Sequence, residues 1–549
     1  MKLNEISNRE ELAIILGIPV RRLTYILYHK KTENLYTSFT IPKKNGEERQ
    51  IDCPNGELRE IQKRLEIQLL EYCNEKAKQK DLNQKISHAF IKKKSIVTNA
   101  AVHRNKRYIL NVDLKDFFHN IHFGRVMGYF QKNQDFEMNY EVAVTIAQIV
   151  CYRGCLPQGA PTSPLISNLI GNIVDISVIQ LAKKYRLSYT RYADDMTFST
   201  NDKHFLEKKE EFICELREKI EKNGFKLNES KTRLTYKDSR QEVTGIVVNK
   251  IINTKREFIK NTRAMANKLY YTGKFKINGE EGTINQLDGR FAFINQQDKY
   301  NNTTHKVKKS IVDFNSRERE YQKFLFYRYF VNRNKPLIIT EGKTDVLYLK
   351  AALKKYYKEY PNLIKKNGEE YSYRISFLKR SKRVRYFFGM NKDGADAMMN
   401  IVNFYKGKNK LTNYAKMFKE KYKCKFEFPV ILLYDNEQVK SKPLKKLKGT
   451  LNINTEIKEK LYVNVEENLF ILTNPLVKGK AECEIEDLFT DDTLAHEISG
   501  KKFERGVVED KGKTHYGKSR FSQYIYNDYE NIDFSNFIPL LDALNEIVS

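Results

Sequence analysis

The sequence predicts two fold classes in succession, an α+β part followed by an α/β part with a parallel sheet. At 549 residues the chain is several times the usual domain length, so more than one core is expected. Up to about residue 330, short strand-like runs (RYILNVDL, LSYTRY, MTFST and VTGIVVN) alternate with amphipathic helical patterns. Beyond that point the unbroken apolar runs PLIIT and FPVILLY are typical of strands buried on both faces, and DVLYLKAALKKYYK predicts a helix between them.

Charge composition points to a polyanionic partner. The chain has 98 Lys and Arg against 69 Asp and Glu, a net charge of +29, which favours nucleic acid binding. The N-terminus has no apolar core of a signal peptide, and the apolar stretch from Leu165 carries Asn168, Asn172 and Asp175, which a membrane span would avoid. Seven scattered cysteines form no CxxC pair. We therefore predict a cytoplasmic protein with reduced thiols and no membrane partner.

Three acidic residues form the first candidate site. Asp194 and Asp195 stand side by side in RYADDMTFS, between two strand-like runs, and Asp113 ends the run RYILNVDL. Adjacent carboxylates raise each other's pKa, so they need open solvent or a nearby cation. A solvated turn would explain the pair alone. Together with Asp113, however, they provide carboxylates from separate segments, which is what nucleotidyl transfer with two metal ions requires.

Three other segments are compatible with such a reaction. The stretch IPKKNGEERQID (41–52) predicts a basic hairpin in which Lys43, Lys44 and Arg49 flank a turn and suit phosphate contact. The proline-rich LPQGAPTSP (156–164) predicts a stiff turn that opens a helix beside an incoming base pair. The segment GFKLNESKT supplies Lys231 as a candidate proton donor to the leaving pyrophosphate.

The order VDLKDFF, LPQGAPTSP, YADD and GFKLN resembles the catalytic blocks of reverse transcriptases over about residues 40–250. NAAVH (99–103) and VTG (243–245) are similar to two signatures of the retron branch of that family. The resemblance implies a right-hand polymerase with fingers, palm and thumb, in which Asp113, Asp194 and Asp195 share two Mg²⁺ ions. It also implies a structured non-coding RNA as partner, priming from a 2′-hydroxyl of that RNA, and a branched RNA–DNA product.

The same resemblance assigns further residues. It implies nucleotide-binding roles for Arg49, Gln158 and Phe118, the last as the ring that excludes a ribose 2′-OH. Core packing beside Phe117 is the alternative for Phe118. The RNA-binding residues implied by the two signatures are Asn99, His103, Val243, Thr244 and Gly245. A polymerase or maturase without a dedicated RNA remains the alternative to a retron enzyme.

A second acidic group follows the two apolar runs of the C-terminal part. Glu341 comes after PLIIT, and Asp435 and Glu437 come after FPVILLY. Because the carboxyl ends of parallel strands meet at one sheet edge, these carboxylates are expected to converge on one metal. Helix capping by Thr340 or Asp345 is the alternative reading of TEGKTD.

The spacing E…DxE resembles the Toprim domain of topoisomerases, some primases and OLD-type nucleases. The usual second element is DxD, and Glu437 lengthens one ligand by a methylene. EIEDLF resembles a later block of the OLD-like branch, which makes secondary candidates of Glu484, Glu486 and Asp487. The resemblance implies a nuclease that uses Mg²⁺ or Mn²⁺, with Glu341 as a catalytic group, acting on a nucleic-acid target.

These inferences give three predicted domains: fingers and palm over 1–250, thumb and linker over 251–330, and Toprim over 331–549. The predicted function is a retron reverse transcriptase fused to a Toprim nuclease effector in anti-phage defence. The alternative is a non-catalytic Toprim scaffold that binds the hybrid or mediates oligomerisation, and a homo-oligomer is compatible with either.

Overall fold

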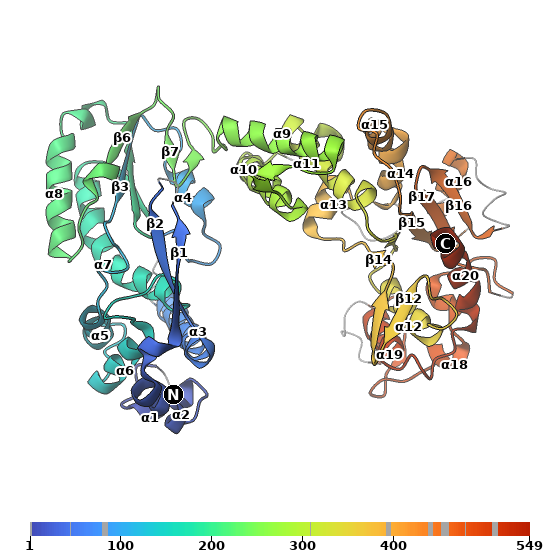
Figure 1. Cartoon of the computed structure of the whole chain (residues 1–549), viewed down its shortest axis with the longest axis horizontal. Coiled ribbons are helices and arrows are strands. Elements are labelled where there is room, and N and C mark those ends of the chain that lie inside the picture. Colours follow the sequence, from blue (N-terminus) through green and yellow to red (C-terminus); the bar gives the residue numbers. More distant parts are fainter. Residues whose placement is uncertain are drawn as a thin grey trace. The chain divides into compact units, whose positions relative to one another are not determined.

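The computed structural model describes residues 3–43, 46–79, 86–307, 309–390, 397–437, 443–451, 460–477, 479–507 and 514–549. The chain forms two compact units (Figure 1). The N-terminal unit comprises Met1–Arg256 with Gln297–Asn301, and the C-terminal unit comprises Glu257–Gln296 with Asn302–Ser549. Each unit is described by itself below.

A four-stranded antiparallel sheet is the centre of the N-terminal unit. Its order is β4-β5-β3-β6, from β4 (Ser188–Tyr192), β5 (Asp195–Thr200), β3 (Tyr108–Asp113) and β6 (Arg233–Tyr236). The strand-like runs RYILNVDL, LSYTRY and MTFST are thus confirmed as neighbouring strands. One face is covered by helices, chiefly α7 (Ser163–Lys184) and α8 (Lys209–Lys222), whose apolar residues join those of the sheet in one cluster.

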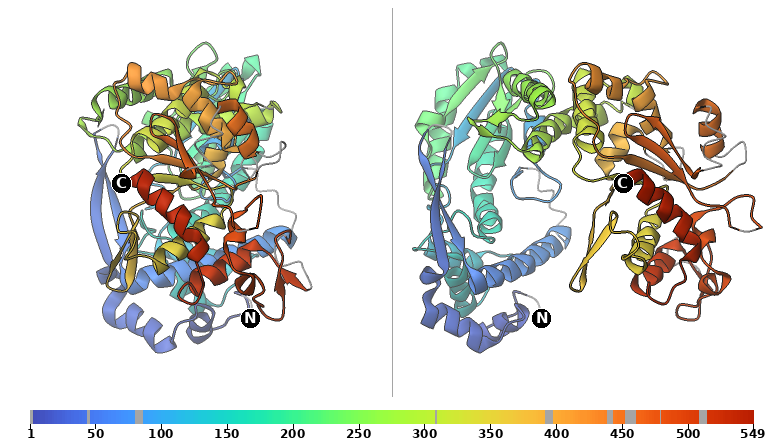
Figure 2. Two further views of the ribbon diagram at one scale, coloured as in Figure 1. Left: turned by 90° about the vertical axis from the view of Figure 1, so that its right-hand side faces the viewer. Right: turned by 45° about the vertical axis from the view of Figure 1, so that its right-hand side comes forward.

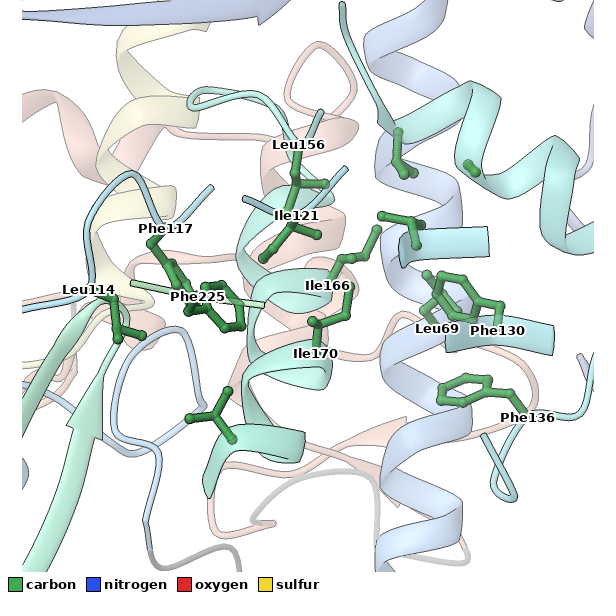
Figure 3. Packing of buried hydrophobic residues seen from close by; sticks show 14 of the residues in the cluster. Leu69, Leu114, Phe117, Ile121, Phe130, Phe136, Leu156, Ile166, Ile170 and Phe225 are labelled. Atoms are coloured by element: carbon green, nitrogen blue, oxygen red, sulfur yellow. The ribbon is translucent and has the colours of Figure 1, made fainter. Parts of the chain in front are cut away.

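Helix α7 begins at Ser163 with Pro164 in its first turn, where a proline costs no hydrogen bond. Figure 3 shows Ile166 and Ile170 of α7 between the Phe117–Phe225 pair and Leu69 and Phe130. By length and composition α7 is apolar enough to cross a membrane, but 56% of its most apolar window is buried within the protein. Its burial and its polar contacts, described below, identify α7 as a core helix of this unit.

The predicted basic hairpin is confirmed. Strands β1 (Tyr36–Pro42) and β2 (Glu48–Pro54) pair antiparallel as a long ribbon at the edge of the unit (Figure 2), although Lys44 lies outside the described residues. Helices surround its base: α1 (Arg9–Ile15), α2 (Val20–Thr24), the π-helix η1 (Tyr25–Lys31), the 3-10 helix η2 (Thr32–Leu35), α3 (Gly56–Gln79), α5 (Phe123–Lys132) and α6 (Tyr140–Val150).

The run VTGIVVN, expected to be a strand, folds as a tight hairpin instead. Strands β7 (Glu242–Val243) and β8 (Ile246–Val247) are joined by Thr244 and Gly245, with φ of 48° and 81°. Two consecutive positive φ angles match the twist of a two-residue hairpin, and glycine reaches them without steric cost. The hairpin packs on α4 (Ile96–Val102) in a small apolar cluster of its own. Two short 3-10 helices complete this unit, η3 (Lys203–Leu206) and η4 (Glu229–Lys231).

A five-stranded sheet organises the C-terminal unit. Its order is β14-β11-β15-β17-β16, from β14 (Ser376–Phe377), β11 (Leu337–Ile339), β15 (Val430–Tyr434), β17 (Leu469–Thr473) and β16 (Tyr462–Glu466). The predicted parallel sheet is confirmed for the first four strands, and β16 is an antiparallel edge.

Alternate residues of these strands serve two separate apolar clusters, as burial on both faces requires. On β15, Ile431 and Leu433 pack with α12 (Asp345–Lys355), α19 (Lys518–Asn527) and α20 (Ile538–Val548). Val430 and Leu432 belong to the opposite cluster, with α14 (Met399–Lys406) and α15 (Tyr414–Glu420).

This second cluster also contains the helices that precede the sheet. Tyr270 of α9 (Arg256–Thr272), Phe291 of α10 (Ile284–Thr304) and Phe324 of α11 (Ser316–Phe326) share it with β11 and β15. The chain is therefore divided into cores at Arg256, not at the boundary near 330 that composition indicated. The assignment of thumb and Toprim domains stays a prediction.

The other described elements of this unit are β9 (Lys276–Ile277), β10 (Glu280–Glu281), η5 (Ile311–Asp313), η6 (Tyr327–Val331), β12 (Ile364–Asn367), β13 (Glu370–Tyr373), α13 (Lys382–Phe388), α16 (Pro443–Leu451), η8 (Ile485–Leu488), α18 (Asp491–Leu494), β18 (Lys502–Phe503), β19 (His515–Tyr516) and η9 (Ser535–Phe537).

Candidate active sites

The three acidic residues of the N-terminal unit meet at one end of its sheet. Asp113 is the last residue of β3 and lies directly opposite Asp195, the first residue of β5. The β4–β5 turn contains only Ala193 and Asp194, with Ala193 at φ 56°. The amide of Leu114 donates to the Asp194 carbonyl over 3.1 Å, which fixes the turn to the end of β3.

The environment of these carboxylates opposes their ionisation. The pKa of Asp195 is raised to about 7, first by removal of its charge from water and then by Asp194 and Asp113. Desolvation and the charge of Asp113 also raise the pKa of Asp194. The third carboxylate has partners: Lys231 Nζ lies 3.1 Å and 3.2 Å from the two Asp113 oxygens, and Asn228 Nδ2 donates to Asp113 Oδ1 over 2.9 Å.

These residues fit divalent cations by their chemistry. Carboxylate oxygens are the ligands that Mg²⁺ prefers, and a cation would offset both the desolvation and the mutual repulsion that raise the two pKa values. Within the described ranges no three Asp, Glu, His or Cys side chains are already drawn together as a metal-binding group. Asp113, Asp194 and Asp195 would hold the metal, and Lys231 contacts the same carboxylate.

A buried ion pair between Arg191 and Asp175 holds the turn that carries Asp194. Arg191, fully buried on β4, forms bonds of 2.8–3.0 Å with both oxygens of Asp175 on α7, and its NH1 donates to the Ala193 carbonyl over 3.2 Å. Gly171 makes room for the guanidinium, because a Cβ there would lie 2.7 Å from Arg191 Cζ. Sequence analysis did not predict this ion pair, although Arg191 stands in RYADD and Asp175 in the apolar stretch from Leu165, two segments that it had singled out.

The predicted nucleotide-binding residues lie on elements near this end of the sheet. Arg49 on β2 is close enough to the site for its charge to lower the pKa of Asp194. The Asp52 amide donates to the Gln158 carbonyl over 2.8 Å, so β2 lies against the LPQGAPTSP turn. Gly159 is required there, because a Cβ would lie 2.8 Å from the Asp52 carbonyl oxygen. Phe118 is half-buried and its ring meets Phe117 edge to face. Its role stays a prediction.

The two retron-like signatures are adjacent in space. His103 and Asn99 are fully buried at α4, where His103 contacts Ser199 and Thr190 over 2.7 Å each and Thr190 donates to Asn99 over 2.6 Å. Burial lowers the pKa of His103 to about 3, so the ring is neutral at pH 7. Thr244 donates to the Ile96 carbonyl over 3.4 Å.

Asn99, His103 and the buried Val243 therefore tie α4 and the VTG hairpin to the back of the sheet. Thr244 is half-buried and Gly245 is exposed. Because these three side chains are buried, any effect they have on RNA binding is indirect and comes from positioning the surface that they support.

The second acidic group also assembles at the carboxyl ends of parallel strands. The Asp435 amide, just after β15, donates to Glu341 Oε1 over 3.0 Å, just after β11. Asp435 Oδ1 accepts from Asn474 Nδ2 over 2.8 Å and from the Ile485 amide over 3.0 Å. Burial raises the pKa of Asp435 to about 9, with further contributions from Glu341, Asp345, Glu486 and Glu484.

Burial raises the pKa of Glu341 to about 7. The charges of Asp345 and Glu437 raise this pKa further, whereas the hydrogen bond from the Asp435 amide lowers it. The predicted trio of Glu341, Asp435 and Glu437 is thus close enough to interact electrostatically. Glu484 and Glu486 belong to the same electrostatic group, and Asp345 Oδ2 accepts from the Gly342 amide over 2.8 Å. Carboxylates with raised pKa values in this number fit a divalent cation.

Three cations border this group, and sequence reasoning missed all of them. Lys518 lies 3.0 Å from Glu486 and 3.3 Å from Glu484, while Arg505 lies 2.7 Å from Asp487. Lys480 also lies 2.7 Å from Asp487. Burial alone would raise the pKa of Asp487, but the hydrogen bonds from Arg505 and Lys480 outweigh this effect and lower the pKa to about 2. No local pattern marks Lys518 or Arg505, because they follow the acidic block by 18 residues or more.

Comparison with known proteins agrees with the N-terminal geometry. The family described as reverse transcriptase (RNA-dependent DNA polymerase) matches residues 41–273. The retron Mx65 reverse transcriptase of Myxococcus xanthus is 30% identical over 306 residues, which cover 52% of this chain and 67% of that protein. The chain belongs to the retron reverse transcriptase family.

Two other retron reverse transcriptases match a similar share of this chain. The Mx162 enzyme of Myxococcus xanthus is 32% identical over 54% of this chain, which spans 65% of that enzyme's length. The Ec86 enzyme of Escherichia coli is 29% identical over 52% of this chain and 84% of its own length. Among solved structures, telomerase from Candida albicans covers 54% of this chain and 60% of its own, with 12% identity and a TM-score of 0.30.

A first prediction concerns the Asp175–Arg191 ion pair, which holds the acidic turn of the N-terminal unit. Asp175→Asn leaves a buried guanidinium without its counter-charge, which should cost about 3–5 kcal/mol of unfolding free energy. Urea unfolding of the N-terminal unit measures this loss. Asp238→Asn, at an exposed position, should change the same transition by less than about 0.5 kcal/mol. Equal midpoints for Asp175→Asn and the wild type would contradict the anchoring role.

The raised pKa of Asp195 provides a second test. Ionising this group costs folding free energy as pH rises from about 4, its ordinary pKa, to about 7, its pKa in the folded protein, and the full cost persists above pH 7. Because Asp195 itself is exposed at the start of β5, solvent screens part of this cost, and Asp195→Asn should raise the Tm by only about 2–4 °C at pH 8 without divalent ions, and by little at pH 4. Mg²⁺ should stabilise the wild type more than the variant.

Thermal melts in EDTA and in Mg²⁺ make this measurement. Asp116→Asn, at an exposed position three residues beyond Asp113, is the matched control and should follow the wild type. A lower Tm for Asp195→Asn at pH 8 in EDTA would contradict the proposed repulsion.

Proposed function

We propose that the N-terminal unit is an RNA-directed DNA polymerase that copies part of a dedicated structured RNA into a branched RNA–DNA hybrid. The observation that carries the proposal is the meeting of Asp113, Asp194 and Asp195 at the end of the β4-β5-β3-β6 sheet, in a chain of the retron family. Bound Mg²⁺ would supply the charge that activates a primer hydroxyl and stabilises the transferring phosphate.

The surrounding residues have distinct roles in this proposal. Arg49, whose charge reaches Asp194, binds the incoming triphosphate. Gln158, held against β2 through its carbonyl, shapes the nucleotide site. Lys231, 3.1 Å from Asp113, gives a proton to the leaving pyrophosphate.

Recognition of the RNA is proposed for the surface that the two signatures support. Since Asn99 and His103 are buried, they position this surface, and Thr244 and Gly245 at the hairpin turn are the groups that RNA can reach. The net charge of +29 supports polyanion binding in general. A polymerase without a dedicated RNA would copy unrelated templates equally well.

Asp194→Asn should abolish DNA synthesis, at least about 1,000-fold, because loss of one ligand disturbs two-metal geometry while phosphate contacts elsewhere remain. RNA retention by the variant should stay within about twofold of the wild type. Primer extension and filter binding on the same preparation measure both. Asp238→Asn, at an exposed position outside these blocks, serves as control and should extend normally. Full extension by Asp194→Asn would overturn the assignment.

Phe118→Ala should admit ribonucleotides, because removal of the half-buried ring opens space for a 2′-OH, while deoxynucleotide incorporation persists. Competition between dCTP and CTP in primer extension gives the discrimination ratio, expected to fall by about 10-fold or more. Phe117→Leu, a change in the fully packed neighbour, should leave the ratio unaltered. An unchanged discrimination ratio in Phe118→Ala would show that this ring serves only core packing.

For residues 331–549 of the C-terminal unit we propose a Toprim metal-dependent nuclease that acts as the effector of an anti-phage retron. The parallel sheet, the Glu341–Asp435 contact of 3.0 Å and the raised pKa values of both residues support it. Asp435 and Glu437 would hold Mg²⁺ or Mn²⁺ against a phosphodiester, with Glu341 as ligand or proton-transfer group. The proposed effector is restrained by the hybrid and released when a phage perturbs it.

A non-catalytic scaffold is the second candidate, favoured by Lys518 and Arg505, which already pair with Glu486 and Asp487. The two candidates differ in their response to loss of one carboxylate charge. A scaffold that acts through its shape tolerates such a loss, whereas a metal-dependent nuclease does not.

Glu341→Gln and Asp435→Asn should leave branched DNA synthesis at the wild-type level and abolish both nucleic-acid cleavage and protection of cells from phage. Quantified DNA product and phage challenge of the same cells form the matched pair of measurements. Glu359→Gln, at an exposed position on the same unit, should retain both functions. Normal protection by folded Glu341→Gln and Asp435→Asn proteins would favour the scaffold.

A further inference from the structure

A recess beside the N-terminal helices lies on elements that none of the roles above uses. Helix α2 passes directly into the π-helix η1, and the recess of about 500 Å³ lies along this junction. Its lining consists of Val20, Arg21, Thr24, Tyr25, Tyr28 and His29. The widened turn of a π-helix often occurs at functional sites, since it displaces side chains from the regular helical positions.

Aromatic faces dominate this recess. Tyr25 is 47% exposed and Tyr28 is 48% exposed, so two large rings one turn apart each keep about half of their surface accessible. The rings of Tyr25 and His29 are stacked, with centroids 4.8 Å apart and an interplanar angle of 20°. Tyr25 and Tyr28 thus each present part of an aromatic surface at the protein's exterior.

Cations accompany these rings. The Arg9 guanidinium lies 4.8 Å from the Tyr28 centroid and Lys30 Nζ lies 5.5 Å from that of Tyr25. Both have carboxylate partners, Arg9 at 3.5 Å from Glu141 and Lys30 at 2.8 Å from Glu57. Arg21 differs: it is exposed at the rim, and within the described ranges no carboxylate pairs with it. No acidic residue lines the recess.

We propose that this recess binds single-stranded nucleic acid, with a base stacked on Tyr25 or Tyr28 and an adjacent phosphate at Arg21. Exposed aromatic faces with a nearby unpaired cation are the two features that unpaired nucleotides need, because every base has a face to stack and a phosphate beside it. A purely apolar peptide would leave Arg21 without a counter-charge. The site is separate from the catalytic carboxylates and its test does not depend on polymerisation.

The test uses the full chain and a fluorescein-labelled 12-nucleotide RNA or DNA that carries 5-iodouracil. Fluorescence anisotropy should give a Kd at least about 5-fold weaker for Tyr25→Ala/Tyr28→Ala. Tyr25→Phe/Tyr28→Phe retains the rings and should bind within about twofold of the wild type. Photo-cross-linking followed by mass spectrometry should place adducts on the peptide that contains Tyr25 and Tyr28.

Charge is tested separately. Arg21→Glu should weaken binding more than Lys203→Glu, which makes the same charge change at an exposed residue of η3. Thermal melts establish that each variant is folded. Unchanged affinity of folded Tyr25→Ala/Tyr28→Ala, or cross-links confined to other peptides, would overturn the proposal. Preferential binding of the same face to anionic lipid vesicles, lost in the Ala variant, would also overturn it.

Discussion

Desolvation of neighbouring carboxylates, with the repulsion between them, is the constraint on which both candidate sites depend. A strand end that presents two or three such groups is unfavourable unless rigid elements hold it and a cation can enter. In the N-terminal unit desolvation, together with this repulsion, raises the pKa values of Asp194 and Asp195. In the C-terminal unit the same effects raise those of Glu341 and Asp435. The two sheets are unrelated in topology, yet each concentrates negative charge where its strands end.

The surrounding fold supplies what holds this charge in place. In the N-terminal unit a fully buried guanidinium, a glycine that makes room for it and an aspartate on the core helix fix the turn through one carbonyl. In the C-terminal unit backbone amides do comparable work, since the Asp435 and Ile485 amides donate to acidic side chains. Buried pairs of this kind are costly to assemble, and their value lies in a single defined geometry for the groups above them.

Sequence reasoning predicted those parts of the molecule that depend on local pattern. Alternation in RYILNVDL and MTFST predicted the strands that bring Asp113 beside Asp195, and the apolar runs of PLIIT and FPVILLY predicted neighbouring parallel strands. It did not predict contacts between distant side chains without a motif, such as Lys518 with Glu486. VTGIVVN was read as one strand because its apolar residues dominate, whereas positive φ at Thr244 and Gly245 turns the chain back. The three-domain assignment and the roles of the site residues depend on resemblance and stay predictions.

The aromatic cluster around Tyr270, Phe291 and Phe324 has a consequence for modularity. Helices α9 to α11 and the five-stranded sheet have no separate interiors, because rings from both fill one core. Such a core melts as one cooperative block, so loosening of these helices is felt at β11 and β15, the strands that carry Glu341 and Asp435 at their ends. Exchange of the sheet between related proteins would therefore have to carry the three helices with it, because the shared core begins at Glu257.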